Sequence, residues 1–283
     1  MRKYLPFLFI ALCSLSFKLD YKPFELIGKV TTEQGFVIPE AYIQISKKGK
    51  VIAQTKTDNF GNYVLPLSKI GKYTIIVGNK LKYFHPKEKQ QYNFNLSTQF
   101  EESFTLKIDK QVLQDECARL RESFKHMVHN SKNMTYRRSF LNRFPRSGLE
   151  LELFFSSNVK AVNLKKEAKR YVQTVFQENF TGRHTYINMF LDFSQHTDMR
   201  VAGKNTKKYY AGAIPIINKN KEILFSEFEH KIETKVSKFF IWMFSGEAYG
   251  KKKMKKNFDY LAPKYPEVHT LMLNAYDVYL NGE

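Results

Sequence analysis

Two His-x-x-Glu pairs are the residues of this chain whose types and spacing come closest to a metal site. One pair is His85 and Glu88, at a turn in a strand-rich stretch, and the other is His230 and Glu233. On a helix this spacing brings an imidazole and a carboxylate toward one ion, so His230 and Glu233 are the candidate catalytic residues of a zinc-dependent hydrolase. No third ligand is identifiable, and a solvated helix pair explains the spacing better. We therefore assign no metal site and predict no cofactor.

A second pair of histidines, His126 and His129, has the same spacing, with His184 and His196 further along the chain. They have no cysteine partners and no His-Glu-x-x-His signature. We interpret them as surface or core histidines.

The densest charge run is a group of lysines followed by two aromatic residues. Basic residues near a membrane bind anionic headgroups, at about 1 kcal/mol per residue. A solvated loop between two helices also contains such runs, so both interpretations stay open. The candidate residues for binding an anionic partner are Lys251, Lys252, Lys253, Lys255 and Lys256.

An export signal is predicted at residues 1–17. Arg2 and Lys3 precede an apolar run that ends at small residues. The run is shorter than the about 20 residues of a membrane-spanning helix. We expect a mature chain that begins near Phe17 and has no transmembrane helix. Lipidation of Cys13 after lipobox cleavage is the alternative.

Charge and export together narrow the choice of partner. The chain has 46 Lys+Arg against 27 Asp+Glu, a net charge of +19. Basic proteins often bind nucleic acid, but export argues against that partner. We expect an envelope protein, an anionic lipid headgroup or an acidic glycan. The expected location is the periplasm, the outer membrane or the outside of the cell. Lysines that only keep the surface solvated are the alternative.

The pattern over residues 24–108 predicts about seven short strands. Apolar residues alternate with polar ones, as at Tyr63 and Leu65. Asp58 and Gly61 predict a turn, because aspartate caps its own turn and glycine adopts a positive φ. Regularly spaced strands of this length predict an antiparallel β-sandwich.

Four sequence blocks occur in order through this region: Gly28-x-Val30, Ile38-Pro39-x-Ala41-x-Ile43, Thr57-Asp58-x-x-Gly61-x-Tyr63-x-Leu65 and Gly71-x-Tyr73-x-Ile75. Their order and spacing resemble the carboxypeptidase regulatory-like (transthyretin-like) domain. Glu40 departs from the family, which usually has glycine before the alanine. The resemblance implies a non-catalytic accessory module of an exported protein, and such a module does not by itself name a function.

From residue 110 the apolar residues follow helical spacing. We expect helices at Lys110–Asn130, Met134–Phe144, Leu164–Phe180, Tyr186–Phe193 and Ile223–Phe244, and from Pro266 onward. Tyr209–Ile217 contains Pro215 and is predicted to be an edge strand or a loop. Leu149–Phe155 is ambiguous between strand and helix. Cys117 lies on the apolar face of the first helix, where a buried thiol acts as a small hydrophobe.

The sequence therefore predicts a multidomain β + α protein. A signal peptide (1–17) precedes a β-sandwich (18–109) and a basic, mainly α-helical domain (110–283). The hypothesis for function is an exported, non-catalytic envelope or secreted binding protein. In it, the sandwich is a spacer or docking module and the helical domain contacts an anionic partner. The alternative is an exported hydrolase, metal-dependent around His230 and Glu233, with its active site in the helical domain.

Overall fold

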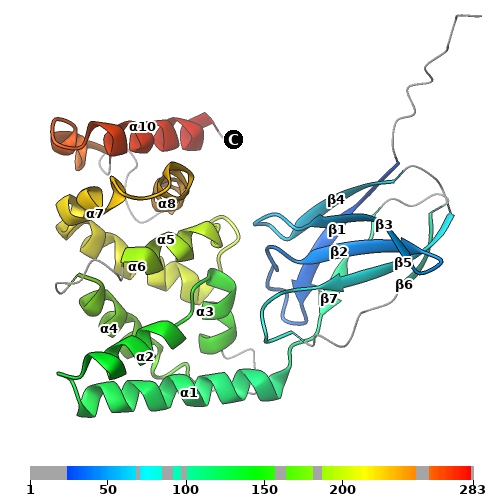
Figure 1. The fold of residues 1–283 in the computed structure, drawn as a ribbon, viewed down its shortest axis with the longest axis horizontal. Coiled ribbons are helices and arrows are strands. Elements are labelled where there is room, and N and C mark those ends of the chain that lie inside the picture. Colours follow the sequence, from blue (N-terminus) through cyan, green and yellow to red (C-terminus); the bar gives the residue numbers. More distant parts are fainter. Residues whose placement is uncertain are drawn as a thin grey trace, which may run out of the picture.

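A β region and a helical region follow one another along the chain. The structure is a computed structural model that describes residues 24–67, 71–84, 92–96, 101–156, 164–180, 187–246 and 255–281. Figure 1 shows the strands on one side and the helices stacked on the other, so the expected order of β followed by α is confirmed. Within the described ranges, no helix has the length and apolar content that crossing a bilayer requires. The predicted signal peptide and Cys13 lie outside these ranges.

Two small sheets form the β region. The first has the strand order β4-β1-β7 and the second β3-β2-β5-β6. In β4, Tyr63 and Leu65 are buried and Val64 between them is exposed, as the alternation predicts. The strands are β1 (Phe24–Thr32), β2 (Tyr42–Lys47), β3 (Lys50–Lys56), β4 (Asn62–Leu67), β5 (Gly71–Gly78), β6 (Tyr92–Leu96) and β7 (Phe104–Leu106).

Strand β7 runs parallel to β1, with Val30 opposite Phe104 and Thr32 opposite Leu106. The expectation of a purely antiparallel arrangement is therefore wrong at this edge. The other strand pairs of the described residues are antiparallel. The chain reaches β7 after β5 and β6 of the second sheet, so it returns to β1 by a crossover. A crossover, unlike a hairpin, permits a parallel pair.

The turn between β3 and β4 has the geometry that its sequence predicts. The Asp58 carboxylate accepts hydrogen bonds from the backbone N–H groups of Phe60 (2.8 Å) and Asn62 (2.9 Å). Gly61 has a φ of +76°, and a Cβ on it would lie 2.7 Å from a backbone carbonyl oxygen of β1. Glycine is therefore the residue that fits this position.

Glu40 occupies a backbone conformation that favours glycine. Its φ is +57°, in the left-handed region that L side chains rarely adopt. Lys56 Nζ donates a hydrogen bond to Glu40 Oε2 at 2.6 Å, and this bond lowers the pKa of the Glu40 carboxyl. Since both side chains are about half exposed, the ion pair offsets little of the backbone strain.

The helical region begins at α1, where the Asp109 side chain accepts a hydrogen bond from the Val112 N–H. Cys117 is buried on α1, as predicted. Figure 1 shows α1 and α10 at opposite ends of the stack. The helices are α1 (Lys110–His129), α2 (Met134–Arg143), α3 (Gly148–Phe155), α4 (Ala168–Phe180), α5 (Ile187–Gln195), α6 (Lys204–Lys219), α7 (Lys221–Phe228), α8 (Glu233–Ser245) and α10 (Pro266–Asn281), with a short 3-10 helix η2 (Asp259–Leu261).

Helix α6 replaces the edge strand or loop expected at Tyr209–Ile217, so that expectation is wrong. Pro215 lies inside the helix at an exposed position. Its ring leaves the Ala211 carbonyl without a helical hydrogen bond, and Ala211 is exposed too, so water can bond that carbonyl. The buried residues of α6 follow helical spacing: Thr206, Tyr209, Tyr210, Ala213, Ile214 and Ile217.

The single helix expected at Ile223–Phe244 is two helices, α7 and α8. The chain turns at residues 229–232, where the Lys231 N–H donates to the Phe228 carbonyl at 3.0 Å. The turn brings the Phe228 ring onto the Phe239 ring, with centroids 5.0 Å apart. One straight helix would separate these residues by about 16 Å along its axis. Burial of the two rings against each other therefore favours the break.

Aromatic rings fill the core of the helical region. Trp242, the only tryptophan of the chain, is 2% exposed. It packs edge-on against Tyr210 (5.3 Å between centroids) and Phe193 (5.8 Å). Such pairs contribute about 0.5–1.5 kcal/mol each beyond burial. They fix α8 against α5 and α6.

The two regions contact each other at their edges. The Tyr83 ring after β5 packs edge-on against Phe154 of α3, and its hydroxyl donates to Glu150 Oε1 at 3.2 Å. At a second place, the Arg200 guanidinium lies 4.4 Å from the centroid of the Phe60 ring. Aromatic and cation–π contacts thus join the sheets to the helices.

Candidate functional site

His230 and Glu233 do not share a helix. His230 is exposed in the turn after α7, and Glu233 is the first residue of α8. The prediction that both side chains project from one helix face is therefore wrong. In the described part of the chain, no group of three His, Cys, Asp or Glu side chains could hold a metal ion. His85 and Glu88 lie outside that part. The hydrolase hypothesis required His230 and Glu233 on one helix face, so the structure gives these two residues no support as its metal ligands.

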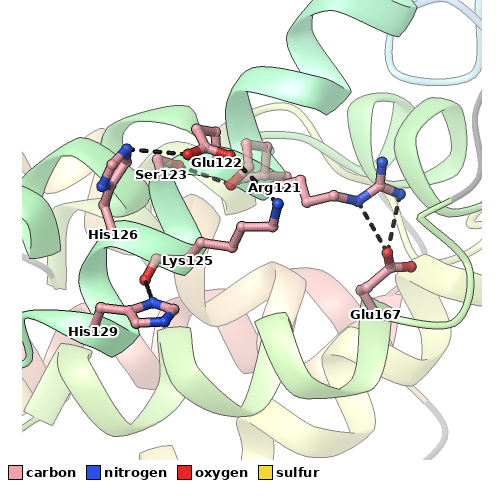
Figure 2. Close-up of polar contacts among 8 residues, drawn as sticks. Arg121, Glu122, Ser123, Lys125, His126, His129 and Glu167 are labelled. Atoms are coloured by element: carbon pink, nitrogen blue, oxygen red, sulfur yellow. Dashed lines mark hydrogen bonds and ion pairs between the residues drawn. The ribbon is translucent and has the colours of Figure 1, made fainter.

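His126 and His129 project from α1 toward different partners, as Figure 2 shows. His126 Nε2 lies 3.2 Å from Glu122 Oε1. His129 Nδ1 lies 2.8 Å from the Lys125 carbonyl oxygen. Both histidines are exposed, so of the two interpretations, surface or core, the structure supports the first.

The predicted anion-binding run lies only partly within the described residues. Lys251, Lys252 and Lys253 are outside them. Lys255 is half-buried, with Nζ 5.2 Å from the centroid of the Tyr276 ring on α10, and Lys256 is exposed. Binding of an anionic partner by this run stays a prediction.

A cleft of about 990 Å³ opens between α3, α4 and α6. Its volume is in the range of sites that hold small organic molecules. The lining combines lysines with apolar side chains. The lysines are Lys165, Lys169, Lys204 and Lys208, and the larger apolar residues are Leu151, Phe155, Val172, Phe176, Tyr209 and Ile216.

The four cleft lysines give the cleft an excess of positive charge. Lys165 lies in the turn before α4 and Lys169 in its first turn, and Lys204 and Lys208 are one turn apart on α6. All four are exposed, and none forms an ion pair with another described residue. Among the described lining residues, Glu152 has the only carboxylate. A cavity whose walls carry an excess of one sign of charge concentrates ions of the other sign, so this cleft attracts anions.

Glu152 holds the start of α6 in place. Its side chain on α3 is 4% exposed and accepts hydrogen bonds from the Thr206 N–H (2.9 Å), the Thr206 hydroxyl (3.0 Å) and Asn205 Nδ2 (3.0 Å). Gly203 is the N-cap of α6 and has no side chain to cap it. Glu152 supplies the missing acceptor from another helix, and its charge opposes the positive end of the helix dipole. These bonds position the part of α6 that carries Lys204 and Lys208.

Aromatic side chains form the apolar part of the cleft. Phe176 of α4 packs against Tyr209 of α6, with ring centroids 5.0 Å apart. Gly212 permits this approach, because a Cβ there would lie 2.7 Å from a carbon of the Phe176 ring. Burial raises the pKa of Tyr209, so its phenol stays neutral. Val172 and Ile216 are half-buried and also line the cleft.

Two residues outside these helices also shape the cleft, one by lining it and one by holding an adjacent turn in place. Phe36, in the connection between β1 and β2, lines it from the β region. Arg121 of α1 donates from Nε (3.1 Å) and Nη2 (3.0 Å) to Glu167 Oε1, as Figure 2 shows. Charge-assisted bonds of this kind are strong and directional. They fix the turn before α4, which carries Lys165.

Sequence reasoning did not identify the cleft lysines. Each wall contributes two lysines at i, i+4 spacing, and that spacing is visible in the sequence. The same spacing is typical of any solvated helix face. The packing of α3, α4 and α6 is what brings the four cations to one cavity.

No protein-family model matches the chain, and no curated protein is similar to it. The function is therefore argued from the cleft and its charge.

Proposed function

We propose that this protein is an exported, non-catalytic binding protein that holds an anionic ligand in the cleft between α3, α4 and α6. The observation that carries the proposal is the set of four cleft lysines, which form no ion pair within the described residues. Like charges repel, by about 1 kcal/mol per pair at 4 Å in water and less at longer distances. An anion placed among the lysines replaces this repulsion with attraction. Glu152, the only carboxylate among the described lining residues, accepts hydrogen bonds from Asn205 and Thr206 and does not pair with a cleft lysine, so the lysine charges stay available to a ligand.

The β region, in this proposal, is a transthyretin-like β-sandwich that acts as a spacer or docking module. Support comes from the four sequence blocks, from the two sheets and from the Asp58 turn with its left-handed Gly61. The domain border is proposed near Asp109, whose side chain begins α1. The contact between Tyr83 and Phe154 joins the two domains at this border.

The proposed location is the cell envelope or the outside of the cell. Residues 1–17 support export, and the net charge of +19 supports a partner with acidic groups, such as an anionic lipid, an acidic glycan or an envelope protein. The intact mass of the protein from its native source tests this part. A chain that begins near Phe17 supports signal cleavage, and an acylated Cys13 supports membrane attachment. A mass that includes residues 1–17 contradicts export by this signal.

The test of anion binding compares two double variants with the same change of charge. K169Q/K208Q removes two cleft lysines. K166Q/K207Q removes two other exposed lysines of the same segments, and neither of these two lines the cleft. Binding of the anionic dye anilinonaphthalene sulfonate is measured by fluorescence at low salt. We expect an affinity about tenfold lower for K169Q/K208Q and a change within about twofold for K166Q/K207Q, since only the first pair borders the ligand. Equal loss in both variants, or no loss in either, contradicts the proposal.

A further inference from the structure

The cleft places apolar surface directly beside its lysines. On α4, Val172 and Phe176 follow Lys169 at intervals of three and four residues, and so lie on the same helix face. On α6, Ile216 lies two turns beyond Lys208 on one face. Val172 and Ile216 are half-buried, so part of their aliphatic surface is accessible from the cleft. A ligand with an apolar part would remove that surface from water.

The volume of the cleft also points to a ligand larger than an inorganic anion. A volume of about 990 Å³ lies at the upper end of the range for sites that bury small organic molecules. Phosphate or sulfate at the lysines would leave most of this volume to water. Since the affinity of such sites comes mainly from apolar contacts, with a few charged groups that fix orientation, the ligand needs both kinds of surface.

We infer that the ligand is a single-chain amphiphile with an anionic headgroup. The chain lies against Val172, Phe176 and Ile216, and the headgroup contacts Lys169 and Lys208. This inference rests on the proposed function, because it names the class of ligand for the same cleft. Carboxylate and phosphate headgroups share the chemistry that lysine recognises, since an ammonium group binds either as a point charge.

A chain-length series tests the apolar part of the inference. Calorimetric titration of the full chain uses butyrate, octanoate and decanoate, with decan-1-ol as the neutral counterpart. We expect the affinity to rise by at least about twofold, and up to about fourfold, for each added methylene that becomes buried. Decan-1-ol is expected to bind at least about tenfold more weakly than decanoate, because it lacks the charge. Decyl phosphate against decanoate then shows which headgroup the lysines prefer.

Two variants separate the headgroup site from the chain site. K169Q/K208Q is expected to weaken decanoate at least about tenfold and to leave decan-1-ol within about twofold. Val172→Trp fills the apolar part of the cleft, and we expect it to remove the dependence on chain length while butyrate still binds. The matched control is Val278→Trp, which changes a half-buried valine of α10 that does not line the cleft. Circular dichroism verifies that each variant is folded.

The outcomes distinguish this inference from the proposed function. Affinity that depends on the lysines but not on chain length overturns the amphiphile and leaves anion binding standing. A second outcome is an affinity that rises with chain length, is equal for decan-1-ol and decanoate, and does not change in K169Q/K208Q. This outcome overturns both the amphiphile and the proposed anion binding. The absence of saturable binding by every member of the series overturns the amphiphile, while lysine-dependent binding of the anionic dye would still support the proposed function.

Discussion

Replacing Glu152 with alanine is expected to destabilise the protein, because this carboxylate caps α6 from a different helix. Its oxygens accept hydrogen bonds from the Thr206 N–H and hydroxyl and from Asn205 Nδ2. Thr206 is fully buried, so water does not replace the lost acceptor there. The cleft lysines on α6 depend on the same bonds for their position.

The magnitude follows from three contributions. Loss of an N-cap acceptor costs about 1 kcal/mol. Loss of a negative charge at a helix N-terminus costs about 1 kcal/mol. The unsatisfied Thr206 N–H adds about 1 kcal/mol. Since these contributions overlap, we expect Glu152→Ala to lower the free energy of unfolding by about 2–3 kcal/mol. Glu152→Gln keeps an amide oxygen for the Thr206 N–H and is expected to cost about 1 kcal/mol.

Thermal unfolding followed by circular dichroism measures the effect, with an expected decrease in Tm of about 4–10 °C for Glu152→Ala. Glu229→Ala, at an exposed position, is the control and is expected to change stability by less than about 0.5 kcal/mol. Gly203→Ala provides a second test, because its Cβ would lie 2.4 Å from Glu152 Cδ. In the Glu152→Ala background this clash is absent, so the two substitutions are expected to couple by at least about 1 kcal/mol. Additive effects would refute the reasoning.

Three further predictions concern other parts of the chain. Glu40→Gly is expected to raise the free energy of unfolding by about 0.5–1 kcal/mol, because relief of the left-handed strain exceeds the loss of the exposed Lys56 ion pair; a decrease in Tm contradicts it. Burial raises the pKa of the Cys117 thiol to about 12, so iodoacetamide at pH 8 is expected to label it slowly in the folded protein and rapidly in urea; equal rates contradict the burial. Phe36→Ala is expected to weaken decanoate binding about threefold in calorimetry, because Phe36 lines the cleft; an unchanged affinity removes the β region from the site.

Local sequence signals predicted the elements whose geometry is set locally. The Asp58 turn is one case, because its capping bonds and the positive φ of Gly61 lie within four residues. Helix α1 is another, because its apolar face follows helical spacing. In both cases the residues that make the structure are neighbours in sequence.

Packing between distant residues decided the elements that were predicted wrongly. The stretch from Glu229 to Ile232 contains no glycine or proline, so the break between α7 and α8 has no local signal. It follows from the contact of Phe228 with Phe239. Helix α6 tolerates Pro215 because the residue is exposed to water, and this exposure cannot be inferred from the sequence alone.

The residues of the candidate site were not predicted from the sequence, and its preference for an anion stays a proposal. The net charge indicates an anionic partner, and the densest lysine run was the natural place to expect it. The cleft lysines come from two pairs that are 35 or more residues apart in the sequence, Lys165 with Lys169 and Lys204 with Lys208. Their meeting depends on how α4 and α6 pack, which spacing alone does not give.

Trp242 makes the protein its own fluorescent reporter. As the only tryptophan, it reports on one place in the protein, the contact of α8 with the rings of Tyr210 and Phe193. Selective excitation of the indole therefore follows the helices alone, while circular dichroism follows both regions. If the two signals change at the same denaturant concentration, the sheets and helices unfold as one cooperative unit. If they separate, the contact between Tyr83 and Phe154 joins two bodies that melt independently. Because the Phe193 ring packs against both Trp242 and the cleft residue Tyr209, we expect the same emission to respond to occupation of the cleft without any attached label.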